Sequence, residues 1–287
     1  MSEYNDYSDI LVEVPDEDLE ELADIYRSRS YMPHASSLLK NGHRLRRQGC
    51  FFIQFLSPRN CWKKDGTFFA LMEFPPLYQL SIFTMDESGE SVYQGLMNTK
   101  RIDFNKNLEF EAIPHIVYST VMRVIDEKKL NIENNNQCFI YTVPQKVARN
   151  FQMKCPNHLE IRRLEISQAD FMNSIWPHRS PGSEKYVTSL IETCGGYGLF
   201  IKSTNELVSW ILKKKLGEIG LLQTVDHHKR KGFGSIILKK MSKEVAEDGE
   251  NPTGIVSVSN EASIKLLEKE HFENLGWCYY IKVNGKK

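Results

Sequence analysis

The residues with the clearest chemical potential lie between Gly217 and Ile237. One carboxylate, Glu218, begins an apolar run that ends in the basic, glycine-containing turn Lys-Arg-Lys-Gly-Phe-Gly at residues 229–234. Unpaired N–H groups at a helix N-terminus bind anions, glycine lets the backbone approach closely, and basic side chains attract phosphate. If a helix begins directly after the turn, the pattern predicts a polyphosphate site. The alternative is an ordinary strand–helix turn with exposed lysines.

The elements that would position this stretch follow one another regularly in the second half of the chain. Hydrophobic periodicity and cap residues predict strands and helices there. The expected strands cover 159–164, 198–202, 207–213, 218–225, 255–258 and 276–283, and the expected helices cover 167–176, 183–192, 233–246 and 260–271.

The first half reads as α/β and shows no reactive constellation. Helices are expected over 15–29, 35–48 and 110–129, and strands over 51–55, 67–74, 77–83, 91–96 and 137–143. Residues 1–15 form an expected disordered acidic tail. With 144–157 as a candidate linker, the predicted domains are 16–150 and 158–287.

Composition excludes several classes of protein. The chain of 287 residues has 37 Lys+Arg and 37 Asp+Glu, so its net charge of zero does not indicate a nucleic-acid partner. No apolar run is long enough to span a bilayer, and no stable membrane association is expected. The six cysteines include no C-x-x-C pair, which favours reduced thiols in a cytoplasmic compartment. The acidic N-terminus is also unlike a mitochondrial presequence.

No metal is expected. His227 and His228 are adjacent, and neighbouring side chains on an extended stretch point in opposite directions. The sequence near them shows no group of carboxylates or cysteines to complete a site.

From residue 159 onward the order of elements resembles the GNAT acyltransferase superfamily. Residues 229–234 stand where that superfamily has [Q/R]-x-x-G-x-[G/A], and Asn260-x-x-Ser263 matches its second motif. The stretches Leu207–Trp210, Gly217–Ile219 and Ser259–Ala262 look like the glycine N-acyltransferase-like family, with its FR47-like C-terminal domain. The resemblance covers about residues 158–287.

This resemblance implies a fold of α/β (α+β type): a central, mixed, mostly antiparallel sheet flanked by helices, with a degenerate GNAT-like N-terminal half. It also implies acyl-CoA or acetyl-CoA as co-substrate and a small-molecule amine, such as glycine or another amino acid, as acceptor. In that family the strand carrying the carboxylate has a bulge and splays from its neighbour. We expect this opening near Leu222–Thr224.

The implied roles fall on particular residues. Glu218 would be the general base, since a desolvated carboxylate accepts a proton from the incoming ammonium, with Gly220 leaving room for substrate. The residues expected to contact the cofactor are Leu222, Gln223, Thr224, Val225, Lys229, Arg230, Lys231, Gly232, Phe233, Gly234, Ser235, Asn260 and Ser263. Asn260 also suits a helix N-cap. His178 and Arg179 are candidates for the acceptor pocket.

One departure from the superfamily pattern concerns the leaving group. Leu267 stands where many GNAT enzymes carry a tyrosine that protonates the thiolate. Cys278, Tyr279, Tyr280 or water are possible substitutes. The rival hypotheses are therefore an acetyltransferase for a protein amine or polyamine, and a catalytically weak CoA-binding regulatory module. The named family is often mitochondrial, which leaves that compartment as the alternative.

Overall fold

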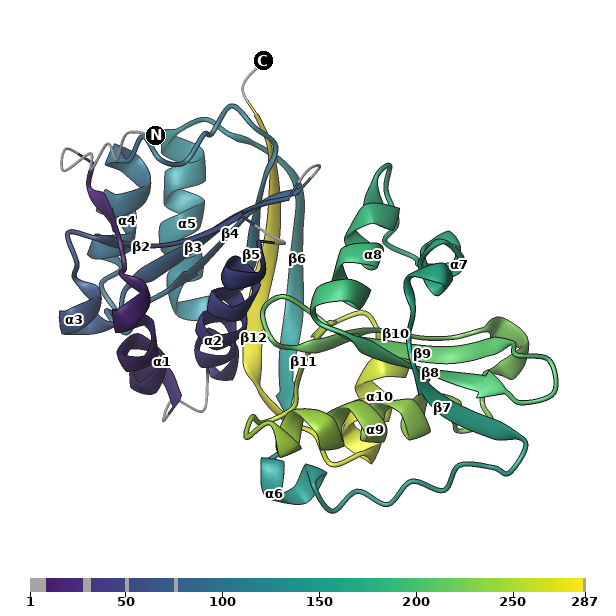
Figure 1. Ribbon diagram of the computed structural model, residues 1–287. Helices are drawn as coiled ribbons and strands as arrows, with labels where there is room; N and C mark the ends of the chain where they lie inside the picture. The colour runs from purple at the N-terminus through teal and green to yellow at the C-terminus, as the bar shows by residue number, and fades with distance from the viewer. Residues whose placement is uncertain (1–8, 28–31, 50–51, 75–76, 286–287) are drawn as a thin grey trace. The chain divides into compact units, whose positions relative to one another are not determined.

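The computed structural model describes residues 9–27, 32–49, 52–74 and 77–285. The chain divides into two compact units (Figure 1). The first contains residues 1–138 and 277–287, and the second contains residues 139–276. None of the helices in the described ranges combines the length and apolar character that a bilayer span needs.

The first unit is built on a mixed sheet in the order β1-β2-β3-β4-β5-β12. Its strands are β1 (Leu11–Glu13), β2 (Phe52–Pro58), β3 (Phe68–Phe74), β4 (Leu77–Phe83), β5 (Leu108–Pro114) and β12 (Glu273–Asn284). Neighbouring strands are antiparallel except β4 and β5, which run parallel.

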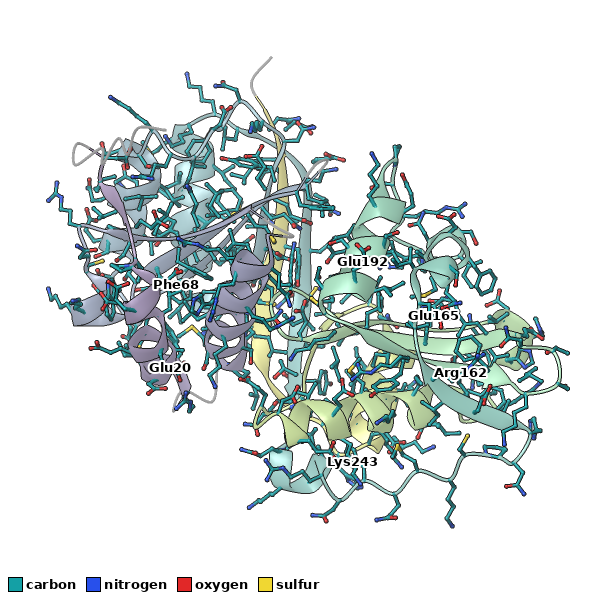
Figure 2. The ribbon with its side chains drawn as sticks, viewed as in Figure 1. Glu20, Phe68, Arg162, Glu165, Glu192 and Lys243 are labelled. Carbon is teal, nitrogen blue, oxygen red and sulfur yellow. The ribbon has the colours of Figure 1, made fainter. Side chains whose placement is uncertain are left out.

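Helices cover both faces of this sheet. Successive residues of a strand point to opposite faces, so each strand can pack against helices on both sides. The helices are α1 (Leu19–Arg27), α2 (Pro33–Gln48), α3 (Trp62–Asp65), α4 (Glu90–Asn98) and α5 (His115–Glu127), with a short 3-10 turn, η1 (Asp16–Asp18). Phe68, which is labelled in Figure 2, packs edge-on against Tyr26 of α1, at 5.6 Å between ring centroids. Its neighbour Phe69 joins the apolar cluster that contains Val92 of α4 and Val117 of α5.

Three expectations for this unit are wrong. The predicted strand 91–96 is α4, whose Val92 and Leu96 lie one helical turn apart on a buried face. The predicted helix 110–129 begins as strand β5, and Pro114 then caps α5 directly. Residues 9–15 are not a disordered tail: Leu11 is fully buried in β1, and Val14 N–H donates to Phe55. Residues 1–8 lie outside the described ranges.

The second unit repeats the same arrangement, in the order β6-β11-β10-β9-β8-β7. Its strands are the end of β6 (Asn131–Thr142) from residue 139 onward, and β7 (Leu159–Arg163), β8 (Gly196–Ile201), β9 (Leu207–Lys213), β10 (Ile219–Thr224) and β11 (Thr253–Ser257). The pairs from β7 to β10 are antiparallel, whereas β10 and β11 are parallel. The predicted mixed, mostly antiparallel sheet is confirmed in both units.

In the second unit, α7 and α8 lie on one face of the sheet, and α9 and α10 lie on the other (Figure 1). The helices are α6 (Gln145–Ala148), α7 (Ala169–Ser174), α8 (Ser183–Thr193), α9 (Phe233–Glu247) and α10 (Glu261–Lys269), with 3-10 turns η2 (Ile166–Gln168) and η3 (Asp226–His228). Ile237 and Met241 of α9 fill the core against Ile219 of β10 and Val208 of β9. This packing places the start of α9 at the C-terminal end of β10.

The boundaries between the units differ from the predicted ones. Residues 144–157 are no linker, because α6 packs on α9 and Arg149 Nε donates to the Ala246 carbonyl at 2.8 Å. The chain end also returns to the first unit, where residues 278–283 of β12 pair with β5. Both β6 and β12 therefore contribute residues to each unit.

Candidate active site

The site is organised by a bulge in β10. Gly220 lies opposite Leu212 and Gln223 lies opposite Trp210, so Leu221 and Leu222 together face the single residue between them on β9. Leu221 has φ +47°, a conformation that non-glycine residues rarely adopt. Such a bulge leaves backbone groups outside the ladder.

Beyond the start of β10, a cleft separates it from its parallel neighbour. Ile219 is paired with Gly254 of β11. The following residues of both strands line a cavity of about 260 Å³. From β10 these are Gly220, Leu221, Leu222 and Gln223, and from β11 they are Ile255, Val256 and Ser257.

The opening therefore starts earlier than expected. Leu222 and Gln223, two of the residues expected to contact the cofactor, line the cavity, but Thr224 and Val225 are not among its lining residues. Thr224 has rejoined β9 opposite Ser209, with its hydroxyl 2.9 Å from that of Ser209. The Val225 N–H donates to the Val208 carbonyl.

Glu218 lies at the base of this cleft, immediately before β10. Its side chain is 1% exposed and forms an ion pair with Lys214. The second carboxylate oxygen, Oε2, is buried without a hydrogen-bond partner. A buried carboxylate oxygen without a partner is costly unless a donor can reach it, so this atom is suited to receive a proton or an N–H group from the cleft.

The hairpin turn between β9 and β10 explains the Lys214–Glu218 pair. The Lys214 N–H donates to the Glu218 carbonyl at 2.7 Å, and Gly217 turns the chain at φ +84°. The stem of Lys214 then passes over Gly220, where an added Cβ would lie 2.7 Å from Lys214 Cδ. Gly220 thus makes room for Lys214, and it also lines the cavity, so its expected role of leaving room for substrate stays a prediction. Sequence reasoning missed Lys214, although its spacing of four from Glu218 across a glycine turn was an available signal.

The basic turn leads directly into α9, as predicted. Gly232 is the N-cap of this helix at φ +81°, and Arg230 also has positive φ, at +63°. No atom lies within 4 Å of a Cβ built on Gly232, so the space above the turn is open. The backbone N–H groups of Phe233, Gly234 and Ser235 occupy the first turn of α9, where α-helices have no internal acceptors.

The basic side chains of this turn already have neighbours. Lys229 forms a 2.6 Å ion pair with Asp226, and this hydrogen bond lowers the pKa of the Asp226 carboxyl. Lys231 Nζ lies 3.4 Å from Nδ1 of His228. Arg230 is exposed. An anion at this turn would therefore meet a helix N-terminus and Arg230 before it competes for Lys229.

The Ser235 hydroxyl faces the interior of the unit. Its Oγ donates to Glu270 Oε1 at 2.6 Å, and Lys239 forms an ion pair with the other oxygen of Glu270 at 2.9 Å. Glu270 is 3% exposed. Only the main chain of Ser235 is therefore available to a phosphate in this arrangement.

The start of α10 forms the opposite wall of the cleft. Asn260 caps the helix, with Oδ1 accepting from the Ser263 N–H at 3.1 Å. Asn260, Ser263 and Leu267 all line the cavity. The predicted N-cap at Asn260 is confirmed. Leu267, which stands where many GNAT enzymes carry a tyrosine, lines the cavity with an apolar side chain.

Of the two residues predicted for the acceptor pocket, one lines the cleft. His178 lines it, together with Trp176 and Pro177, but the Arg179 guanidinium donates to the Ser174 carbonyl and is not among the lining residues. Cys278 and Tyr279 belong to the first unit, where Tyr279 stacks on Tyr118. None of the suggested substitutes for the tyrosine is among the residues described as lining the cleft.

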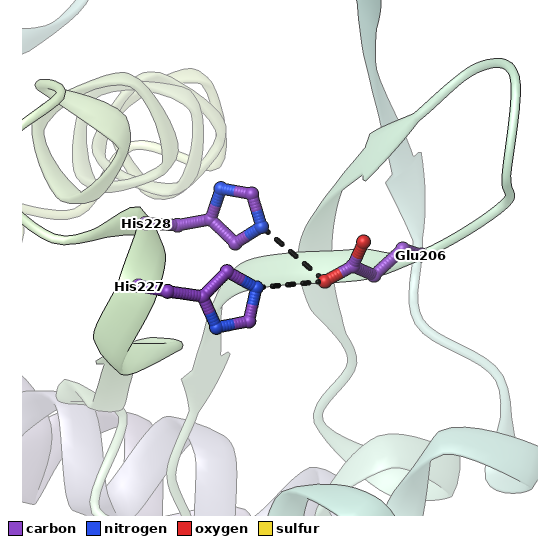
Figure 3. Close-up of side chains that lie close together, drawn as sticks. All are labelled: Glu206, His227 and His228. Atoms are coloured by element: carbon purple, nitrogen blue, oxygen red, sulfur yellow. Dashed lines mark hydrogen bonds and ion pairs between the residues drawn. The ribbon is translucent and has the colours of Figure 1, made fainter.

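The two grounds for expecting no metal at His227 and His228 do not hold. These residues occupy the 3-10 turn η3 and not an extended stretch, and both rings face Glu206 from the β8–β9 loop (Figure 3). The carboxylate is distant in sequence, and only the fold brings it there.

Comparisons with known proteins agree with this architecture. The model of the FR47-like protein family matches residues 196–281, and that of a domain of unknown function, DUF5645, matches residues 10–124. No curated protein matches the chain. A solved structure of a Drosophila protein is 21% identical, covers 96% of this chain and 99% of its own, and has a TM-score of 0.86.

Two further solved structures identify the fold. A tandem GNAT protein from the clavulanic acid biosynthesis pathway is 9% identical, with coverage of 96% and 99% and a TM-score of 0.55. A GCN5-related N-acetyltransferase from Sphaerobacter thermophilus is 10% identical, with coverage of 96% of each chain and a TM-score of 0.55. The chain therefore has a two-part GNAT fold. Together with the FR47-like match, this supports the GNAT superfamily, while the glycine N-acyltransferase-like family stays a prediction.

Proposed function

We propose that the protein is an acyl-CoA-dependent N-acyltransferase that uses acyl-CoA or acetyl-CoA and a small amine acceptor, with glycine or another amino acid as the first candidate. One observation carries the proposal. The buried, incompletely paired carboxylate of Glu218 lines the same cleft as the bulge of β10, and β10 leads to the basic turn before α9. Base, oxyanion donor and phosphate site would thus lie along one strand.

In this proposal the cofactor lies along β10. The pyrophosphate binds the backbone N–H groups at the start of α9 with help from Arg230. The pantetheine arm pairs like an added strand with backbone groups near Leu222 and Gln223. Asn260 and Ser263, on the facing wall, contact the same arm.

Glu218 would accept the proton from the acceptor ammonium through Oε2. The neutral amine then attacks the thioester carbonyl, and a backbone N–H freed by the bulge at Leu221–Leu222 stabilises the oxyanion. Collapse of the tetrahedral intermediate breaks the C–S bond and releases the CoA thiolate, and the attacking nitrogen loses its remaining extra proton to solvent to give the neutral amide. Leu267 has no proton to give, so the thiolate takes its proton from solvent.

The cavity volume of about 260 Å³ favours a small-molecule acceptor, with Trp176 and His178 beside it. A nucleic-acid partner and a stable membrane association are not part of the proposal. The proposed compartment is the cytoplasm, with mitochondria as the alternative.

The test is to incubate the protein with acetyl-, benzoyl- and long-chain acyl-CoA and a panel of amino acids and polyamines, and to follow release of free thiol. Glu218→Gln should lower turnover about 10²–10⁴-fold, the usual contribution of a general base, without abolishing CoA binding measured by calorimetry. Glu192→Gln, an exposed glutamate of α8, is the matched control and should retain activity. Equal turnover of the two variants would overturn the role of Glu218.

A CoA-binding module with little catalysis is the second candidate. It is favoured by the Lys214 ammonium, which already occupies one oxygen of Glu218, and by the apolar Leu267. Tight CoA binding without thiol release for any acceptor would select this candidate. A protein that CoA does not stabilise against thermal unfolding would exclude both.

A further inference from the structure

We propose that Glu206, His227 and His228 form a binding site for a divalent transition-metal ion of the Zn²⁺ class. Glu206 Oε1 lies 3.3 Å from Nε2 of His227 and 3.2 Å from Nε2 of His228. All three candidate ligand atoms lie within 4.8 Å of one another. Figure 3 shows both imidazole rings directed at the same carboxylate oxygen.

The spacing of these atoms fits a metal site better than a pair of strong hydrogen bonds. Zinc binds histidine nitrogen and carboxylate oxygen at about 2.0–2.2 Å, so two ligands of a tetrahedral ion are separated by about 3.3–3.5 Å. A charge-assisted N–H···O hydrogen bond is shorter, about 2.7–2.9 Å. The observed 3.2 and 3.3 Å match the edge of the tetrahedron. Only a small movement would be needed to admit the ion between the three groups.

The three ligands are also held to different degrees, as an accessible metal site requires. The His228 side chain is 11% exposed and stacks on Phe233, with centroids 6.0 Å apart. The side chains of His227 and Glu206 are 68% and 41% exposed. One ligand is thus fixed by the core, and two can close around an ion that arrives from solvent. A ligand set of two imidazoles and a carboxylate suits Zn²⁺ among divalent metal ions. Three protein ligands leave the fourth position of a tetrahedral ion for water.

Lys231 is the charged group that opposes occupancy. Its Nζ lies 3.4 Å from Nδ1 of His228, where the ammonium can donate to an unprotonated ring nitrogen. A neutral imidazole that binds metal through Nε2 carries its proton on Nδ1, so it can no longer accept this bond. Metal binding must therefore displace Lys231, and removing its charge should tighten binding.

The experiment is calorimetric titration of the untagged, full-length protein with Zn²⁺ in a non-chelating buffer. We expect one ion per chain at this site. His227→Ala and Glu206→Gln should each weaken binding at least tenfold, and Lys231→Gln should strengthen it severalfold. His158→Ala removes an exposed histidine elsewhere in the second unit and should leave the affinity unchanged.

Two further measurements keep the proposal testable. Zn²⁺ should raise the melting temperature of the wild type and not that of His227→Ala, because only a ligand bound to the native state stabilises it. Co²⁺ should bind with a spectrum free of thiolate charge transfer, since no cysteine belongs to the cluster. Unchanged affinity of His227→Ala, or a thiolate–cobalt band, would show that the proposal is wrong.

Discussion

The ion pair between Lys214 and Glu218 allows the energetics of the site to be tested directly. Lys214→Met keeps an apolar stem over Gly220 but removes the ammonium that partners Glu218. Glu218 would then carry a buried charge with no compensation. Removing one partner of a buried ion pair costs about 3–5 kcal/mol. Because the Lys214 side chain is 17% exposed, we expect the lower end of this range, about 3 kcal/mol.

The assay is urea unfolding at neutral pH. Lys213→Met is the matched control, since it removes the neighbouring charge at the end of β9, outside the ion pair with Glu218. The double variant Lys214→Met with Glu218→Gln should recover most of the lost stability, because a neutral amide needs no counter-charge.

Two results would refute this reasoning. The first is a Lys214→Met variant whose free energy of unfolding lies within about 0.5 kcal/mol of the Lys213→Met control, the range of ordinary surface substitutions. The second is a double variant no more stable than Lys214→Met alone. Either would mean that the burial of Glu218 is relieved by solvent or by another group.

Three further predictions concern other parts of the chain. Gly232→Ala should lower the free energy of unfolding by about 1–2 kcal/mol because of strain at positive φ, and it should weaken CoA binding. Gly249, at the other end of α9, has the same open space and φ +87°. Gly249→Ala should therefore lower the stability equally and leave the CoA affinity unchanged. CoA should bind with a stoichiometry of one per chain by calorimetry, because the turn at residues 86–90 in the first unit is acidic; a ratio of two would contradict this. Asp9→Asn should destabilise the protein by about 1–3 kcal/mol at neutral pH. Burial raises the pKa of the Asp9 carboxyl, but hydrogen bonds from the backbone of Lys100 and Leu11 outweigh burial, so the net shift of the pKa is downward. The stability that Asp9 contributes is therefore present at neutral pH and is lost as pH falls through the native pKa, so the difference in stability between the variant and the wild type should close in acid.

Local patterns were enough to predict many elements and part of the site. The strands at 67–74 and 77–83 are correct to within one residue, since their aromatic and aliphatic runs are bounded by a glycine and a proline pair. The N-cap at Asn260 depends only on residues three apart. The same reasoning failed for β5, because a strand buried on both faces has no alternation to distinguish it from the start of α5.

What could not be predicted depends on contacts between distant segments. Nothing near His227 in the sequence indicates that Glu206 approaches it, because the approach follows from the pairing of β9 with β10. The unit boundaries were misplaced for a similar reason. The hydrophobic pattern of β12 predicts a strand, but it does not say which sheet that strand completes.

A comparison of the two units distinguishes the features of the shared fold from the local features of the candidate site. In the first unit, strand β4 corresponds in order to β10, yet β4 keeps a continuous register with β3 from Phe68–Phe83 to Phe74–Leu77. It also pairs with β5 at the successive residues Gln79 and Leu80, and β4 and β5 stay in closer contact than β10 and β11 do. At the following helix, the space beside Gly89 is filled by the Thr120 hydroxyl, and not open as at Gly232. One architecture thus carries a bulge, a cleft and a basic turn in the second unit, and a closed sheet with an acidic turn in the first. The proposed chemistry therefore depends on these local features, because the fold that the two units share does not supply them.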